Sequence, residues 1–146
     1  MSVVLENWLS IGKLLKHKTN KEEIDAIFGV IERCLKDASL KGLSSDQKYI
    51  LSYQAVFEAG LAMLYCSGYR PIKAGHHYIV WQCLKEIFDK EYHKTILLFE
   101  GAAKKRSKLS YDKAGLASQQ EADEMYKEAV EFIRHAKINL KTTTDF

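Results

Sequence analysis

Residues that interrupt a chain are few in this sequence. Its 146 residues include one proline and eight glycines, and they show no internal repeat, no low-complexity tract and no linker longer than a turn. The hydrophobic content is 47%, and a chain of this length can bury about two thirds of the surface that it exposes when unfolded. We therefore expect one compact domain over residues 1–146, with a core that needs neither disulfides nor metals.

Cysteine is scarce, and its spacing gives no zinc motif. The three cysteines form no CxxC pair and lie in apolar stretches of helical periodicity: Cys34, Cys66 and Cys83. An odd number of cysteines in such places indicates reduced thiols in a cytosolic protein. The possible metal ligands are His76, His77, Cys83 and His93, and no pair of them has the one-face spacing of a helical site such as HExxH. We therefore expect no metal and no cofactor.

Long apolar runs and glycine-rich nucleotide motifs are also missing. The longest strongly apolar run, residues 59–66, is far shorter than a membrane span. Glu6 interrupts the apolar N-terminal stretch, which has neither the basic leader nor the small-residue cleavage site of a signal peptide. No GxGxxG, Walker or GxSxG motif occurs. The sequence therefore predicts a soluble, cytoplasmic protein and does not support a nucleotide-binding fold or a serine hydrolase.

Charge of one sign is not in large excess, but it is unevenly distributed. The formal net charge of +3 is too small to indicate nucleic-acid binding by itself. Positive side chains are concentrated in one run: Lys104, Lys105, Arg106, Lys108 and Lys113. Acidic residues follow directly within residues 121–131, so the positive field is local and partly opposed. Such a run is either a solvated helix end or a patch that binds phosphate groups.

Helical periodicity runs through almost the whole sequence, and no segment alternates with a period of two. Apolar spacing predicts helices over about residues 4–15, 24–38, 45–67, 75–88, 91–108 and 119–140, followed by a frayed tail over 141–146. Capping boxes are expected at Thr19 with Glu22 and at Ser118 with Glu121, and Ser44 or Ser45 is expected to cap the helix that begins there. We therefore expect an all-α fold, an up-and-down bundle of four to six helices.

The helix that follows Ser44 is apolar on nearly every face, so other elements must cover it on several sides. Gly60 and the alanines around it would let neighbouring helices approach closely. Gly68 is expected to end this helix, and Pro71 prevents its continuation. We expect it to be the central element of the bundle.

Arg70, His76 and His77 follow this helix in one short loop. A histidine at a helix N-terminus lies near a positive partial charge, which favours the neutral imidazole and therefore a proton acceptor near pH 7. Arg70 could bind a phosphate with two parallel hydrogen bonds. The alternative is structural: one histidine caps the next helix, the other packs beside Trp81, and Arg70 forms a salt bridge.

The basic run ends close to a second polar group. Arg106 and Ser110 share a helical face, and Tyr111 lies at or past the end of the helix, where its hydroxyl could turn back toward the guanidinium. Lys104, Lys105 and Lys108 would add positive charge for a phosphate. The alternative is that Tyr111 is a core aromatic residue and the lysines are solvated.

The order of these features resembles bacterial HEPN-domain proteins. The pattern SxDxxxxxxYxAxxxAxxAxLxxxGYR covers residues 44–70; GHH follows, then KKR shortly before Tyr111 and Asp112, a glycine and a capped last helix. The resemblance covers about residues 35–140, with the N-terminal helices over residues 2–38 packed on this core. It implies a helical bundle that dimerises, with the motif of each subunit facing a shared cleft.

The resemblance also implies function. Many such proteins are metal-independent RNases or toxins, often encoded with a nucleotidyltransferase-like partner, and others bind nucleic acid or nucleotide. Their arginine–histidine signature falls on Arg106, with Tyr111 in place of the histidine and Ser107 as the small polar residue. A phenol with a pKa of about 10 is a poor base at neutral pH.

These observations lead to three hypotheses. The first is a homodimer of toxin–antitoxin or defence type that binds RNA or a nucleotide around Arg106, with nuclease activity weak or absent. The second is a metal-independent RNase in which His76 or His77 is the base while Arg106 and Arg70 bind the phosphate. The third is a non-catalytic module that docks a partner protein.

Overall fold

Helices make up most of the protein. The computed structural model describes residues 3–73, 76–111 and 113–143, and for residues 111 and 141–143 it describes the backbone alone. The described α-helices are α1 (Val3–Ser10), α2 (Lys21–Ala38), α3 (Ser45–Cys66), α4 (His76–Ile87), α5 (His93–Tyr111) and α6 (Gln119–Thr143). Two short strands, β1 (Leu14–Lys16) and β2 (Tyr69–Pro71), and the 3₁₀ turn η1 (Lys90–Tyr92) complete the set. The expected all-α bundle is confirmed.

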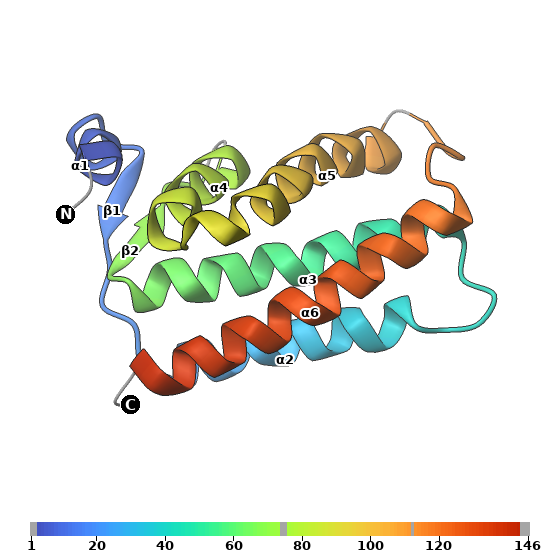
Figure 1. Cartoon of the computed structure of the whole chain (residues 1–146), viewed down its shortest axis with the longest axis horizontal. Helices are drawn as coiled ribbons and strands as arrows, with labels where there is room; N and C mark the ends of the chain where they lie inside the picture. The colour runs from blue at the N-terminus through green and yellow to red at the C-terminus, as the bar shows by residue number, and fades with distance from the viewer. Residues whose placement is uncertain (1–2, 74–75, 112, 144–146) are drawn as a thin grey trace.

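The long helix α3 is the centre of the bundle. In Figure 1 it lies between a layer formed by α4 and α5 and a second layer formed by α2 and α6, and it packs against all four. Its fully buried side chains include Tyr53, Ala55 and Val56, which lie on different faces of the helix. A helix apolar on all sides has to be covered in this way.

A glycine allows α4 to approach α3 closely. A Cβ atom added at Gly60 would lie 2.9 Å from Leu84 Cδ1 and 3.5 Å from both Trp81 Cη2 and Val80 Cγ1. Real Cβ atoms do not approach other heavy atoms to 2.9 Å, so the end of the Leu84 side chain would have to shift to make room for a larger residue. This contact confirms the expectation that Gly60 permits close packing.

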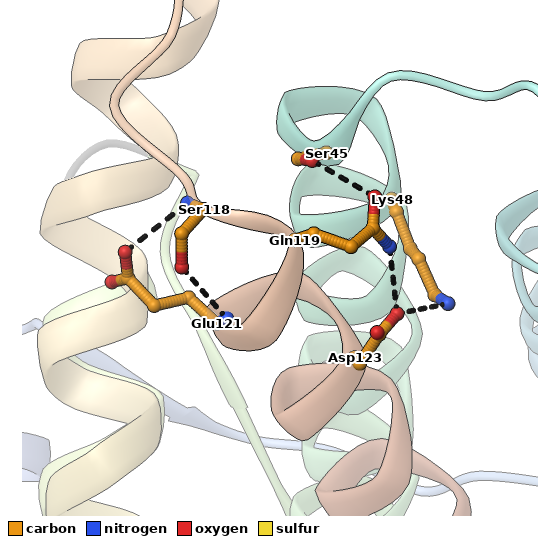
Figure 2. Close-up of polar contacts among 6 residues, drawn as sticks. All are labelled: Ser45, Lys48, Ser118, Gln119, Glu121 and Asp123. Atoms are coloured by element: carbon orange, nitrogen blue, oxygen red, sulfur yellow. Dashed lines mark hydrogen bonds and ion pairs between the residues drawn. The ribbon is translucent and has the colours of Figure 1, made fainter.

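Caps define the first turns of α3 and α6. Ser44 Oγ accepts a hydrogen bond from Gln47 N at 3.1 Å, as the sequence predicts. The predicted capping box of α6 is present as well: Ser118 Oγ accepts from Glu121 N at 3.0 Å, and Glu121 Oε1 accepts from Ser118 N at 3.2 Å (Figure 2). Each bond uses a backbone N–H that the helix itself cannot satisfy.

Side chains also join the starts of α3 and α6. Figure 2 shows Ser45 Oγ donating to Gln119 Oε1 at 3.2 Å and Lys48 Nζ paired with Asp123 Oδ1 at 2.6 Å. From the loop before α6, Gly115 N and Ala117 N donate to the carboxylate of Asp46 at 2.6 and 3.1 Å. The loop over residues 113–118 is thereby held against α3.

The capping box expected at Thr19 is wrong by one residue. Asn20 is the N-cap of α2, and its Oδ1 accepts from Glu23 N at 2.8 Å. Glu23 in turn accepts hydrogen bonds from Thr19 Oγ1 and shares one with His17 Nε2, both at 2.6 Å. Asparagine caps as well as threonine does, and this register gives the Glu23 carboxylate two further partners.

The first helix is shorter than predicted, and the small sheet was not predicted. Helix α1 ends at Ser10, Gly12 has a φ of 76°, and β1 pairs antiparallel with β2, with Leu15 opposite Arg70. Strands of three residues are too short to show a period of two. Their pairing depends on Gly68, whose φ of 97° turns the chain after α3.

The remaining helix bounds differ slightly from expectation. Helix α5 begins at His93, after η1, and continues to Tyr111 rather than Lys108. Helix α6 continues to Thr143, so the tail expected from residue 141 is helical as far as 143. Apolar spacing cannot predict such ends, because polar residues outnumber apolar ones near the ends of both helices.

Candidate functional site

Arg106 is the basic residue that α5 directs into the bundle. Its side chain is half-buried, and its Nε is buried without a hydrogen-bond partner among the described residues. The positive charge of Arg106 contributes to lowering the pKa of His77 on α4 and opposes the rise in the pKa of Tyr53 on α3. The guanidinium therefore lies where α3, α4 and α5 meet.

Aromatic rings surround the two histidines at the start of α4. The His77 ring stacks on Phe57 with centroids 3.8 Å apart and an interplanar angle of 19°. The His76 ring lies 4.6 Å from His77 and 5.1 Å from Phe57. Both imidazoles are half-buried, so they are shielded from solvent on one side and open on another.

A hydrogen-bond chain connects His77 with the core. Trp81 Nε1 donates to the Tyr53 hydroxyl at 3.0 Å, and this hydroxyl lies 2.8 Å from His77 Nδ1. Tyr53 and Trp81 are fully buried. The chain holds the His77 ring by its Nδ1 atom and leaves its Nε2 atom for other partners.

His77 is neutral at physiological pH. Burial, together with smaller contributions from the neighbouring His76 and Arg106, lowers its pKa to about 4. The sequence predicted a neutral histidine from the helix N-terminus, whereas in the structure burial is the main cause. Burial likewise raises the pKa of the Tyr53 hydroxyl, so this group stays protonated.

His76 is oriented by the backbone. Its Nδ1 atom lies 2.7 Å from the carbonyl oxygen of Lys73, which can only accept a hydrogen bond. Nδ1 therefore carries a proton, and in the neutral ring Nε2 has a free lone pair. Of the two imidazoles, His76 has the arrangement that suits a general base.

The structure places Arg70 elsewhere. Arg70 is exposed on β2, and its charge acts on Glu23 and Tyr65. Tyr65 follows Tyr53 by twelve residues along α3, which corresponds to about 18 Å at 1.5 Å per residue. The predicted site residues Arg70 and Arg106 thus act on tyrosines that lie far apart along α3, and we do not expect them to bind one phosphate together.

The basic run is divided among different faces of α5. Lys105 pairs with Glu121 of α6, and its Nζ lies 5.3 Å from the centroid of the Tyr49 ring. Lys104 and Lys108 are exposed and lie one turn apart on the outer face. Because residues two apart do not face the same way on a helix, these lysines do not point toward the Arg106 guanidinium.

Tyr111 is the last residue of α5. Its side chain, and the whole of Asp112, lie outside the described residues. The expected approach of the Tyr111 hydroxyl to Arg106 therefore stays a prediction.

The aromatic part of the site was not identified from the sequence as functional. Tyr53 and Phe57 lie one turn apart on α3, as do His77 and Trp81 on α4, and this spacing predicted core packing alone. A tyrosine or tryptophan in a buried position needs a hydrogen-bond partner, which is the signal that could have connected Tyr53 with a histidine.

Other properties of the described residues bear on binding. Cys34, Cys66 and Cys83 are free thiols. No group of three or more metal-ligating side chains gathers within residues 3–73, 76–110 and 113–140. In the described part of the chain, every helix is too short or too polar to span a lipid bilayer.

Comparisons of the chain with protein-family models, with curated proteins and with solved structures found no match. The function therefore has to be inferred from the site itself.

Proposed function

We propose that this protein binds phosphate groups of RNA or of a nucleotide through Arg106, as a HEPN-like homodimer of toxin–antitoxin or defence type with weak or absent nuclease activity. The observation that carries the proposal is the half-buried Arg106, whose Nε has no partner among the described residues, beside a neutral imidazole. Arginine presents a planar set of donors that matches the oxygens of a phosphate.

The environment of Arg106 favours an anion as ligand. A buried donor without a partner destabilises the folded protein, so a structure that retains one usually satisfies it with water or a ligand. Lys105 has its counterion in Glu121, whereas no ion pair of Arg106 occurs in the described part of the chain. An incoming phosphate would meet an arginine whose charge is not already neutralised.

A second copy of the chain would pack against α5 in this proposal. Leu97 and Leu98 lie on α5, the helix that carries Arg106, with 57% and 46% of their surface exposed. Burial of these leucines would favour a homodimer through the hydrophobic effect. A nucleotidyltransferase-like protein encoded nearby is the further partner that the HEPN resemblance suggests.

RNA binding and its dependence on salt test the proposal. We expect a fluorescently labelled oligoribonucleotide to bind the wild-type protein with an affinity that falls as salt rises, because phosphate contacts release counterions. Arg106→Ala should weaken binding about 50-fold, the equivalent of losing hydrogen bonds to a charged group. Arg134→Ala, which removes an exposed arginine paired with Glu131, is the matched control.

The control should bind within about twofold of wild type, since an exposed ion pair contributes little. If the wild-type protein retains no RNA at any salt concentration, the proposal is wrong and a module for protein interaction becomes the better hypothesis.

A second function, metal-independent cleavage of RNA, is favoured by His76. Its Nδ1–H bond to the Lys73 carbonyl leaves Nε2 free to take a proton from a ribose 2′-hydroxyl, whose oxygen would attack the phosphorus while Arg106 stabilises the charged phosphorane. The P–O5′ bond would then break, with the 5′-oxygen taking a proton from water, to give a 2′,3′-cyclic phosphate and a 5′-hydroxyl. Incubation of labelled RNA with protein and EDTA measures this activity. Cleavage that disappears in His76→Ala would support it, and intact RNA with wild-type protein would exclude it.

A further inference from the structure

The hydrogen bonds of the Tyr53 hydroxyl fix the tautomer of the neighbouring His77. The Tyr53 hydroxyl is buried and has two neighbours, Trp81 Nε1 at 3.0 Å and His77 Nδ1 at 2.8 Å. An indole N–H can only donate, so the Tyr53 oxygen accepts from Trp81. The hydroxyl proton then needs an acceptor, and His77 Nδ1 is the one that the described residues provide.

The tautomer of His77 follows from this. If Nδ1 carried the proton, both neighbours would donate to the Tyr53 oxygen, and the buried hydroxyl proton would have no partner. The favourable arrangement is Trp81 N–H to Tyr53 oxygen, then Tyr53 O–H to His77 Nδ1. In a neutral imidazole the remaining proton is on Nε2, and burial keeps the pKa of His77 at about 4, so the ring is neutral.

His76 has the opposite tautomer. Its Nδ1–H donates to the Lys73 carbonyl oxygen at 2.7 Å, so its Nε2 accepts in the neutral form. The ring centroids of His76 and His77 lie 4.6 Å apart, and Nε2 is thus a hydrogen-bond acceptor in His76 and a donor in His77. Arg106 adds further donors next to them.

We infer that Tyr53 is a positioning residue that holds His77 as an Nε2–H donor, and that His77 with Arg106 binds a phosphate while His76 accepts a hydrogen bond from a neighbouring ribose 2′-hydroxyl. Phosphate oxygens only accept hydrogen bonds, so they do not bind favourably to the unprotonated Nε2 of His76. A hydroxyl can donate a hydrogen bond to this nitrogen. The 2′-hydroxyl is the group that distinguishes RNA from DNA. The inference rests on the proposed function and specifies that its ligand is a ribonucleotide.

Imidazole ¹⁵N NMR of the wild-type protein tests the tautomers without any ligand. At pH 7.5 we expect His77 to show a protonated Nε2 and an unprotonated Nδ1, and His76 to show the reverse. In Tyr53→Phe, His77 should lose this preference and populate both tautomers. Tyr49→Phe is the matched control, because Tyr49 is also buried one turn away on α3 and its hydroxyl makes no hydrogen bond to a histidine among the described residues.

Binding of paired probes tests the ligand class. An oligoribonucleotide and its 2′-deoxy counterpart of the same sequence are titrated with the full chain, and we expect about tenfold preference for the ribose form. His76→Ala should remove the preference while leaving affinity for the deoxy probe unchanged. Tyr53→Phe should weaken both probes several-fold.

The outcomes separate this inference from the function on which it rests. If His76 and His77 show the same tautomer in the wild-type spectra, the role of Tyr53 is wrong, whatever the protein binds. This measurement does not depend on whether Tyr53→Phe folds. Binding of both probes with equal affinity would overturn the recognition of ribose but leave phosphate binding intact. Binding of neither probe would overturn the proposed function, and ribose recognition with it.

Discussion

Arg106 and Arg70 carry the same side chain in opposite environments. Arg106 lies half-buried beside His77 and Tyr53, with its Nε unpartnered among the described residues. Arg70 is exposed on β2, where its charge acts on the carboxylate of Glu23. A buried donor without a partner has a free-energy cost that a bound anion would remove, and an exposed arginine has none. The depth of a charge in the fold, more than its sign, distinguishes a binding arginine from a surface arginine.

Acidification should show the largest difference in stability between the Arg106 region, which contains His77, and the Arg70 region, which contains Glu23. Below pH 6.5 the unfolded chain protonates His77, while the folded protein keeps it neutral until about pH 4. The stabilisation by the neutral ring is therefore complete above pH 6.5 and is lost as the pH falls toward 4. We expect the free energy of unfolding to drop by about 2 kcal/mol over this window, less than the full shift would give because the ring is partly exposed.

Chemical denaturation at successive pH values measures this drop, and His77→Gln should flatten the dependence of the free energy of unfolding on pH between pH 6.5 and 4.

The Arg70 region responds at lower pH. Burial opposes ionisation of Glu23, but hydrogen bonds from Thr19 and His17 outweigh it and lower the pKa of this carboxyl. Its stabilisation is lost only as the pH falls below the ordinary value of 4.5. If the free energy of unfolding of wild type and His77→Gln falls over the same pH range, the Arg106 and Arg70 regions do not differ in their response to acid.

Replacement of each arginine by methionine should separate stability from binding. Arg106→Met removes a buried donor that lacks a partner and keeps most of the apolar stem, so we expect the protein to become more stable by about 1 kcal/mol while RNA binding is lost. Arg70→Met should change stability by less than about 0.5 kcal/mol, as is usual for an exposed residue. Thermal unfolding and anisotropy measure the two effects; destabilisation by Arg106→Met would indicate that the guanidinium has a partner after all.

The lysines next to Arg106 offer a smaller contrast of the same kind. Lys105→Met breaks the pair with Glu121 and the contact with the Tyr49 ring, for an expected loss of about 0.5 kcal/mol. Lys104→Met alters an exposed side chain and should leave the unfolding midpoint unchanged. Equal midpoints for both variants would show that Lys105 is solvated like its neighbour.

The smallest effect is expected for Arg70 in RNA binding. Because Tyr65, on which Arg70 acts, lies about 18 Å along α3 from Tyr53 at the Arg106 site, Arg70→Ala should alter the dissociation constant by less than about twofold. The same anisotropy assay measures it beside Arg106→Ala. A loss comparable to that of Arg106→Ala would mean that the two arginines contact one ligand, and the comparison between them would fail.

Local signals predicted much of the fold. The helical spacing of apolar residues located every long helix, and the Ser44 and Ser118 caps were correct because a cap depends on side chains within the same turn. The cap of α2 was misplaced by one residue because His17 and Thr19 both hold Glu23, a choice that local propensity does not contain. The pairing of β1 with β2 was missed because three-residue strands have no pattern of their own.

The amino-acid order was enough to establish an all-α bundle around an apolar helix, because periodicity and capping act between residues a few positions apart. It also showed where arginine and histidine were concentrated. Which of these residues meet was decided by packing: close contact at Gly60 brings α4 onto α3, and α5 turns Arg106 inward while leaving Lys104 in solvent. Hydrogen bonds and electric fields act over a few ångströms in space, and residues far apart in sequence reach such distances only in the folded chain.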